Sequence, residues 1–169
     1  IPSYFLGAAV LNLSIEAPIG GLSLYNYNPF STTQIAVKNS LQSATTPKTY
    51  TERYFWGNLT FSTKGIFSVL AAGNNGKGAC EVWPAAFGKD ITGAITVGAI
   101  DRLGARAIFN TTQSSNYGQC VEAWAPGLAI FSTILGGSTT GNVGGGTSFA
   151  APFVAGIAAL ISDLYKNLS

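Results

Sequence analysis

The sequence of 169 residues contains no histidine and no methionine, and only 9% of its residues are charged. Histidine is the side chain that most often serves as a general base near neutral pH. Its absence excludes an active site that uses a histidine base from this chain alone. Because no initiating methionine is present, we expect a piece of a longer protein, produced at Ile1 by cleavage or truncation.

The net charge is also low. Nine basic and seven acidic side chains give a formal net charge of +2, without a basic stripe or an acidic tail. Binding to nucleic acid or to a membrane surface therefore has no support in the sequence. No apolar run is long enough to cross a bilayer. With 47% hydrophobic residues, the sequence predicts a heavily buried globular protein whose partner, if any, is a protein.

Cysteine is scarce as well. Cys80 and Cys120 could form one disulfide, or they could remain buried free thiols. Three Asn-x-Ser/Thr sequons favour a secreted glycoprotein, in which a disulfide would persist. These sequons begin at Asn58, Asn110 and Asn167. A fourth, at Asn12, lies in an apolar run, so we expect it to be buried and unmodified.

Short apolar runs predict strands that are buried on both faces. The predicted strands cover residues 8–15, 66–72, 94–100 and 121–127. Ser31 is the expected N-cap of a helix that should end before Pro47, with an apolar face that includes Ile35, Val37 and Leu41. Buried strands joined by a helix indicate an α/β protein with a parallel sheet. Residues 47–65 are polar but rich in aromatics, and they predict a surface insertion or, alternatively, a contact surface for another chain.

The segment 146–156, Gly-Thr-Ser-Phe-Ala-Ala-Pro-Phe-Val-Ala-Gly, places Ser148 at the start of a helix. From Phe149 to Ile161 this helix is apolar on all sides, so it should run through the core. Pro152 is tolerated there because it falls in the first turn. Ser148 lies where the helix dipole and N–H groups can stabilise an anion, as a nucleophile requires, or it is simply the N-cap.

Asn74 follows the predicted strand at 66–72, in the tetrapeptide Gly-Asn-Asn-Gly. Open parallel sheets place their sites beyond the carboxyl ends of the strands, and the Asn74 amide could donate a hydrogen bond to an oxyanion there. Asparagine and glycine are also ordinary turn residues. The tetrapeptide alone is therefore weak evidence for a site.

Together these segments resemble the subtilisin-like serine proteases. The segment 146–156 is similar, at every position but one, to the serine motif of that family. Residues 71–74 resemble its oxyanion-hole turn, and residues 10–14 resemble its substrate-flanking strand. The sequence around Cys80 and Cys120 looks most like the secreted fungal relatives of proteinase K, where such a pair forms a disulfide.

The resemblance implies a three-layer subtilisin-like α/β fold with a parallel sheet. Residues 1–169 would be a single, partial catalytic domain, its middle-to-late portion, without the C-terminal helices. Ser148 would be the nucleophile and Asn74 the oxyanion donor in peptide-bond hydrolysis through an acyl-enzyme. The residues expected to bind substrate are Leu13, Ser14, Ile15, Ala71, Ala72 and Gly73.

This family also binds calcium, although the reaction requires no cofactor. Glu122, with carbonyl oxygens near Thr92 and Ala94, resembles one structural calcium site. An ordinary solvated carboxylate is the favoured interpretation, because a site built from carbonyl oxygens cannot be seen in a sequence.

In the family, the catalytic aspartate and histidine lie N-terminal to the part present here. No carboxylate of this chain has the Asp-Ser/Thr-Gly context of the triad acid. The expected partner is therefore an N-terminal segment of the same precursor that carries both residues. Phe153 replaces a structural histidine of the serine motif. Glu16 stands where the family has glycine, so its side chain could obstruct a peptide that pairs along this strand.

Two functions stay open at this point. In the first, the chain is the serine and oxyanion-hole segment of a secreted endopeptidase. In the second, it is a catalytically inactive pseudoprotease that acts as a binding or structural module. Asp-Thr-Gly and His-Gly-Thr segments upstream would support the first.

Overall fold

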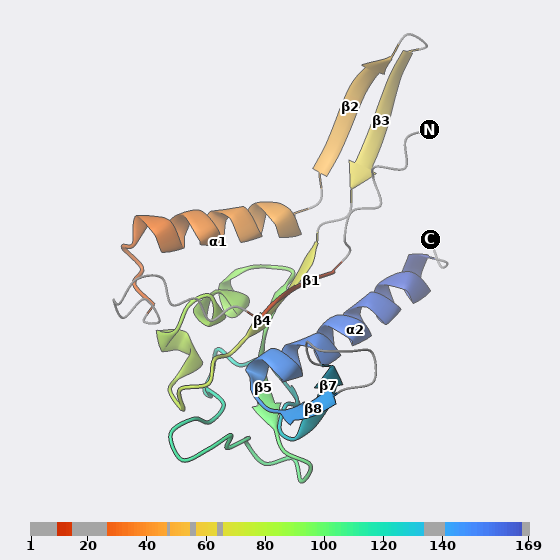
Figure 1. The fold of residues 1–169 in the computed structure, drawn as a ribbon. Helices are drawn as coiled ribbons and strands as arrows, with labels where there is room; N and C mark the ends of the chain where they lie inside the picture. The colour runs from red at the N-terminus through yellow and green to blue at the C-terminus, as the bar shows by residue number, and fades with distance from the viewer. Residues whose placement is uncertain are drawn as a thin grey trace.

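The computed structural model describes residues 10–14, 27–46, 48–54, 57–63, 66–133 and 141–166. Helices and strands are mixed along these ranges, with several strands following one another directly (Figure 1). The strands are β1 (Val10–Leu13), β2 (Lys48–Tyr54), β3 (Gly57–Thr63), β4 (Phe67–Ala71), β5 (Ala94–Ile100), β6 (Ala123–Pro126), β7 (Ile130–Thr133) and β8 (Gly141–Gly144). The helices are α1 (Thr32–Thr45) and α2 (Thr147–Lys166), with the 3₁₀ helices η1 (Ala79–Glu81) and η2 (Ala85–Asp90) between β4 and β5.

A parallel sheet of four strands, in the order β1-β4-β5-β6, forms the centre of the fold. Each strand lies within one of the predicted apolar runs, and β5 has the predicted bounds. The α/β class with a parallel sheet is thus confirmed. Because all four strands point the same way, their carboxyl ends meet at one edge of the sheet, which is where the candidate site lies.

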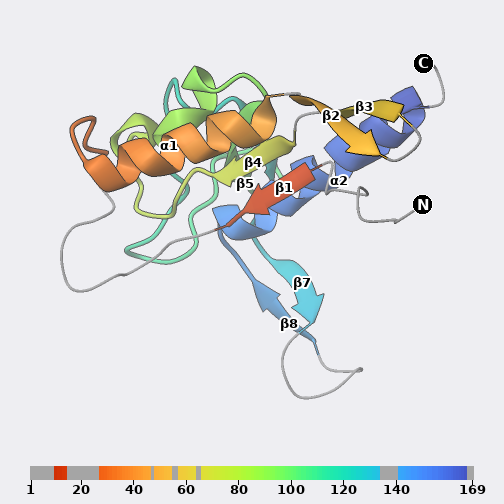
Figure 2. The ribbon, with the colours of Figure 1, turned by 90° about the horizontal axis from the view of Figure 1, so that it is seen from above.

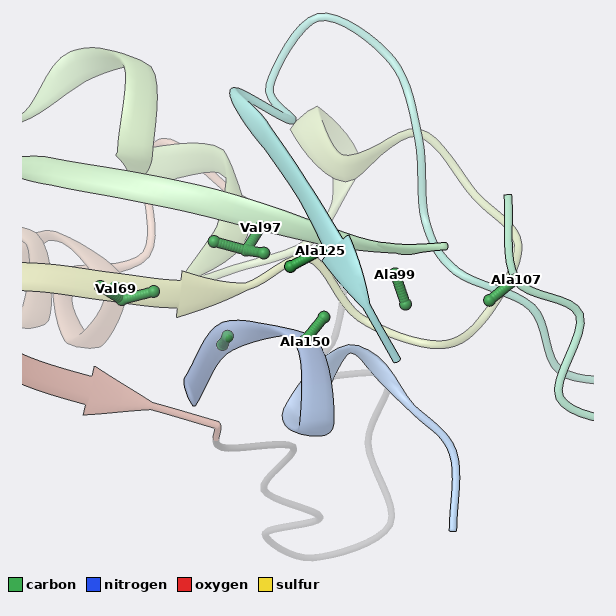
Figure 3. Packing of buried hydrophobic residues seen from close by; sticks show 7 residues of the cluster. Val69, Val97, Ala99, Ala107, Ala125 and Ala150 are labelled. Carbon is green, nitrogen blue, oxygen red and sulfur yellow. The ribbon is translucent and has the colours of Figure 1, made fainter. Parts of the chain in front are cut away.

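Helices cover both faces of this sheet and make three layers, with α1 and α2 on opposite sides (Figure 2). Successive side chains of a strand point to opposite faces. Val69 accordingly packs in the cluster beneath α2, while Leu70 packs with Leu41 of α1 and Phe87 of η2. Figure 3 shows Val69, Val97 and Ala125 of three neighbouring strands gathered against Ala150 at the start of α2.

Helix α1 begins and ends as its sequence predicts. The Oγ atom of Ser31 accepts a hydrogen bond from the N–H of Gln34 at 3.4 Å, which caps the helix, and the helix ends at Thr45 before Pro47. Leu41 is buried, but Ile35 is exposed, so the expected apolar face is only partly correct. The buried positions Gln34 and Leu41 are seven residues apart, two turns of helix, and so lie on one side of α1.

Two antiparallel hairpins leave the central sheet. Strands β2 and β3 pair with Lys48 opposite Thr63, within the predicted insertion at 47–65, and project away from the sheet (Figure 1). Strands β7 and β8 pair with Ile130 opposite Gly144, just before α2 (Figure 2). Neither hairpin was predicted from the sequence. A role for the first in contacting another chain stays a prediction.

Helix α2 is longer than expected and less buried. Ala150 and Ala151 in its first turns are fully buried against the sheet. Phe153, Ile157 and Leu160 are 45%, 57% and 74% exposed. The prediction that the helix runs through the core is wrong for the described residues, because the sheet covers only one side of it. None of the helices that the structure describes combines the length and the hydropathy needed to span a membrane.

The prediction that Asn12 is buried is also wrong. Its side chain is exposed, and the hydroxyl of Ser14 lies 3.3 Å from its Oδ1 atom. Strand β1 is the outermost strand of the described sheet, so part of its surface is not covered by neighbouring elements.

Candidate active site

Ser148 lies in the first turn of α2, immediately after Thr147, where the helix begins. The N–H of Phe149 donates to the carbonyl of Gly146 at 3.0 Å, so the turn already includes Gly146. Ser148 is therefore inside the helix and is not its N-cap. Its side chain is half-buried at the carboxyl edge of the sheet.

Gly146 fixes how this helix starts. Its φ angle of +154° is one that residues with a side chain rarely adopt, and its N–H donates to the carbonyl of Gly127, just after β6, at 2.8 Å. The backbone can therefore turn sharply from the β7–β8 hairpin into α2. This turn brings Thr147 and Ser148 to the ends of the parallel strands.

Asn74 lies on the turn that follows β4, and Thr147 joins it to the start of α2. The Oδ1 atom of Asn74 accepts hydrogen bonds from the N–H of Thr147 at 2.8 Å and from its hydroxyl at 3.0 Å. The same hydroxyl oxygen accepts the N–H of Gly73 at 3.0 Å. Since Oδ1 is turned toward α2, the amide nitrogen Nδ2 is the donor end of the Asn74 side chain.

Thr147, which is 1% exposed, was not among the residues predicted for the site. The feature of the sequence that could have indicated Thr147 is its hydroxyl side chain, which stands between Gly146 and Ser148. Its partners are 73 and 74 residues away in the chain, so only the fold reveals them.

The residues expected to flank the substrate lie at the same edge. Leu13 ends β1 opposite Leu70 of β4, and the hydroxyl of Ser14 lies 3.3 Å from the backbone carbonyl of Ser148. Ala71 ends β4, and Ala72 and Gly73 lead into the turn of Asn74. The structure thus brings Leu13, Ser14, Ala71, Ala72, Gly73, Asn74 and Ser148 together. Ile15 and Glu16 lie outside the described residues.

Cys80 and Cys120 form a disulfide with Cα atoms 5.2 Å apart, which confirms the predicted pair. It joins η1 to the loop before β6. Among the sequons, Asn110 is exposed and accepts the N–H of Thr112 at 2.9 Å. Asn58 lies in β3, and Asn167 falls outside the described residues. Glycosylation of Asn58, Asn110 and Asn167 stays a prediction.

The Glu122 carboxylate, for which calcium binding is the less favoured interpretation, lies beside β5. Its Oε2 atom accepts the N–H of Thr96 at 3.0 Å. Within the described ranges, no group of three or more histidine, cysteine, aspartate or glutamate side chains is placed to hold a metal ion. One carboxylate supplies few of the six to eight oxygen ligands that calcium takes, so calcium binding stays a prediction.

Taken together, the fold and the site define a class: α/β proteins that place a serine at the start of a helix, beside an asparagine, at the carboxyl edge of a parallel sheet. A family model described as the subtilase family matches residues 7–169. The chain belongs to the subtilase family.

Individual relatives agree with this assignment. The chain is 38% identical to the alkaline extracellular protease of Yarrowia lipolytica over 112 residues, which is 66% of this chain and 24% of that protein. It is 41% identical to the subtilisin-like protease 3 of Pseudogymnoascus destructans, over 70% of this chain and 27% of that protein. An extracellular serine proteinase of a Thermus species is 44% identical over 61% of this chain and 23% of that protein.

A crystal structure of a cold adapted subtilisin-like serine proteinase matches with a TM-score of 0.58 and 28% identity. The match covers 90% of this chain and 40% of that structure. The chain therefore has a subtilisin-like fold, as expected. It spans about a quarter of the length of the relatives that it matches.

Proposed function

We propose that this chain supplies the nucleophile and the oxyanion donor of a secreted subtilisin-like serine endopeptidase. A separate N-terminal segment of the same precursor supplies the catalytic aspartate and histidine. The observation that carries the proposal is the pair of hydrogen bonds from Thr147 to Asn74, since they hold the Asn74 amide beside the start of the helix that bears Ser148.

Peptide hydrolysis assigns a role to each residue. The Oγ atom of Ser148 attacks the carbonyl carbon of the scissile bond while the histidine of the partner segment accepts the hydroxyl proton. The carbonyl electron pair moves onto oxygen, and Nδ2 of Asn74 donates a hydrogen bond to that oxyanion. Collapse of the intermediate expels the amine, which takes the proton from the base. The histidine then takes a proton from water, which attacks the ester carbonyl; the bond from carbon to Oγ of Ser148 breaks, Oγ takes back the proton and the acid product leaves.

The same edge can hold the substrate. Strand β1 lies at the edge of the described sheet, so its outer backbone groups are available to an extended peptide. The Ser14 hydroxyl, near the Ser148 carbonyl, links this strand to the serine helix. We propose that the peptide lies between residues 13–15 and 71–73. Glu16 would restrict it, and Glu16→Gly should therefore lower KM.

The partner segment has a surface to cover. The side chains of Phe153, Ile157, Leu160 and Ile161 follow i, i+4, i+7 and i+8 spacing, which places them on one face of α2, and each is 45–74% exposed. An apolar helix face of this kind is rarely left in water. We propose that the segment carrying aspartate and histidine packs on this face.

Secretion is part of the proposal. Two of the relatives are named extracellular proteases. The Cys80–Cys120 disulfide is typical of an oxidising compartment, and the exposed Asn110 sequon would be accessible to glycosylation there.

One observation favours the alternative, a pseudoprotease module: the chain has no histidine to act as base. The experiment that separates the two is reaction of the assembled protein, purified from its natural source, with a fluorophosphonate serine probe. The proposal predicts a covalent adduct on Ser148 and hydrolysis of peptide substrates. An inactive module would give neither.

The role of Asn74 is tested separately. Removing the equivalent donor of subtilisin lowers kcat by about 10²–10³-fold, and we expect the same order for Asn74→Ala. Asn75→Ala is the matched control, because Asn75 is the exposed neighbour in the same turn and takes part through its backbone N–H. Equal effects of the two variants would contradict the assignment.

A further inference from the structure

Asn116 is a buried side chain that holds the turn of Asn74 from the inside. It is 0% exposed and lies in the loop between β5 and β6. Its Oδ1 atom accepts the N–H of Asn75 at 3.0 Å and the N–H of Lys77 at 2.9 Å. Its Nδ2 atom donates to the carbonyl of Ala72 at 2.8 Å. One carboxamide therefore binds the backbone on both sides of Asn74.

The fit between the turn and this amide is close. The backbone N–H of Asn116 donates to the carbonyl of Gly73 at 2.9 Å. Gly73 has a φ angle of +99°, and a Cβ atom there would lie 2.5 Å from Nδ2 of Asn116. A side chain at position 116 must therefore offer an acceptor and a donor in the volume of asparagine. Aspartate has no donor and would place an oxygen against the Ala72 carbonyl.

Backbone contacts align the two segments further. The N–H of Ser114 donates to the carbonyl of Asn74 at 3.1 Å, and the N–H of Gly76 donates to the carbonyl of Ser114 at 2.9 Å. The disulfide joins the ends of the same two segments. Asn116 thus fixes the backbone of the turn, while Thr147 fixes the Asn74 side chain from α2.

We infer that Asn116 is a positioning residue, which directs the Asn74 amide toward the oxyanion by holding the backbone of residues 72–77. This inference rests on the proposed function. An oxyanion donor acts mainly in the transition state, so displacing it lowers kcat and leaves KM nearly unchanged. A displacement of about 1 Å can cost about 10²-fold in rate.

The test is a double-mutant cycle in the assembled protein. Asn116→Ala should lower kcat by about 10- to 100-fold when Asn74 is present. In an Asn74→Ala background, the same change should lower kcat by less than about twofold, because Asn116 acts through Asn74. Equal losses in both backgrounds, or no loss in either, would overturn the inference. Titration with the serine probe gives the concentration of reactive sites, so kcat is calculated per folded, reactive molecule.

Ser115→Ala is the matched control for loss of a buried polar group. Ser115 is also 0% exposed, but its hydroxyl accepts the N–H of Ala99 at 2.9 Å and donates to the carbonyl of Asn116 at 2.9 Å. Its hydroxyl links β5 to the main-chain carbonyl of Asn116, and Ser115→Ala leaves in place the Asn116 carboxamide that binds the turn. Ser115→Ala should therefore lower stability while kcat per titrated site stays unchanged. A kcat loss equal to that of Asn116→Ala would reduce Asn116 to a structural role.

A second readout does not depend on activity. Hydrogen exchange at the Asn75 and Lys77 amides, which donate to Asn116, should be at least about tenfold faster in Asn116→Ala than in Ser115→Ala, since exchange of a protected amide rises with the population in which its hydrogen bond is open. If exchange is faster but no variant reacts with the serine probe, then Asn116 does hold the turn and the proposed function is wrong. If exchange is unchanged, the inference is wrong whether or not the protein is active.

Discussion

Thr147→Val removes the hydroxyl that joins α2 to the Asn74 turn while it keeps the shape of the side chain. Two interactions are lost. The Asn74 Oδ1 atom loses its 3.0 Å hydrogen bond from the hydroxyl, and the buried N–H of Gly73 loses its acceptor at 3.0 Å. The N–H of Thr147 itself still donates to Asn74 at 2.8 Å.

The size of the effect follows from these two terms. A neutral hydrogen bond contributes about 1 kcal/mol net, and a buried donor left without an acceptor costs about 1–3 kcal/mol. Thr147→Val should therefore lower the free energy of unfolding by about 2–4 kcal/mol. Thr147→Ser keeps the hydroxyl and loses one methyl group, so it should cost about 1 kcal/mol.

Urea unfolding of the purified protein measures both values, with Thr33→Val as the control. Thr33 is exposed on α1, and the same chemical change there should stay within about 0.5 kcal/mol. The reasoning is refuted if Thr147→Val is as stable as the wild type. It is refuted equally if Thr147→Ser is as damaging as Thr147→Val, since the methyl group would then matter and not the hydroxyl.

Three further predictions concern other parts of the chain. Gly146→Ala forces an alanine to φ +154° and should lower the free energy of unfolding by about 1–3 kcal/mol. Gly156→Ala, in open space on α2, should raise it by about 0.5–1 kcal/mol. Equal effects of the two variants would show that the backbone angle is not the cause. Replacing Cys80 and Cys120 by serine removes a cross-link between residues 40 positions apart, and a chain-entropy estimate gives a loss of about 4 kcal/mol in the free energy of unfolding. Thermal unfolding of both forms measures the loss, and an unchanged midpoint would contradict this prediction. Leu160→Glu should weaken co-purification of the partner segment and raise the solubility of the isolated chain, and unchanged co-purification would place the partner elsewhere.

The strands could be predicted because each apolar run is bounded by residues that end a strand. Strand β5, for example, lies between Gly93 and Asp101, and no residue within it is charged. The strands of the two hairpins are harder to predict from the sequence. Strand β3 alternates Leu59 and Phe61 with polar residues, which is a usable strand signal. Strand β8 is Gly-Asn-Val-Gly and has almost no strand preference.

Some residues of the site could also be predicted from the sequence, and others could not. Ser148 and Asn74 could be predicted because they stand in local motifs, and the structure places them at one edge of the sheet. Thr147 and Asn116 could not, because their importance depends on hydrogen bonds to residues 39 or more positions away. The exposure of α2 was missed because its sequence is apolar on every side, and sequence alone does not say which side is covered within this chain.

The measurement that tests the central claim most directly is intact-mass analysis of the natural protein before and after treatment with a fluorophosphonate probe, under native and denaturing conditions. The account predicts that this 17.5 kDa polypeptide is associated with a segment that contains aspartate and histidine, and that the probe adds once, at Ser148. The chain alone should not react, because loss of the histidine lowers kcat of subtilisin by about 2 × 10⁶-fold. An associated protein that leaves Ser148 unlabelled, or that is labelled equally after Ser148→Ala, would contradict the claim.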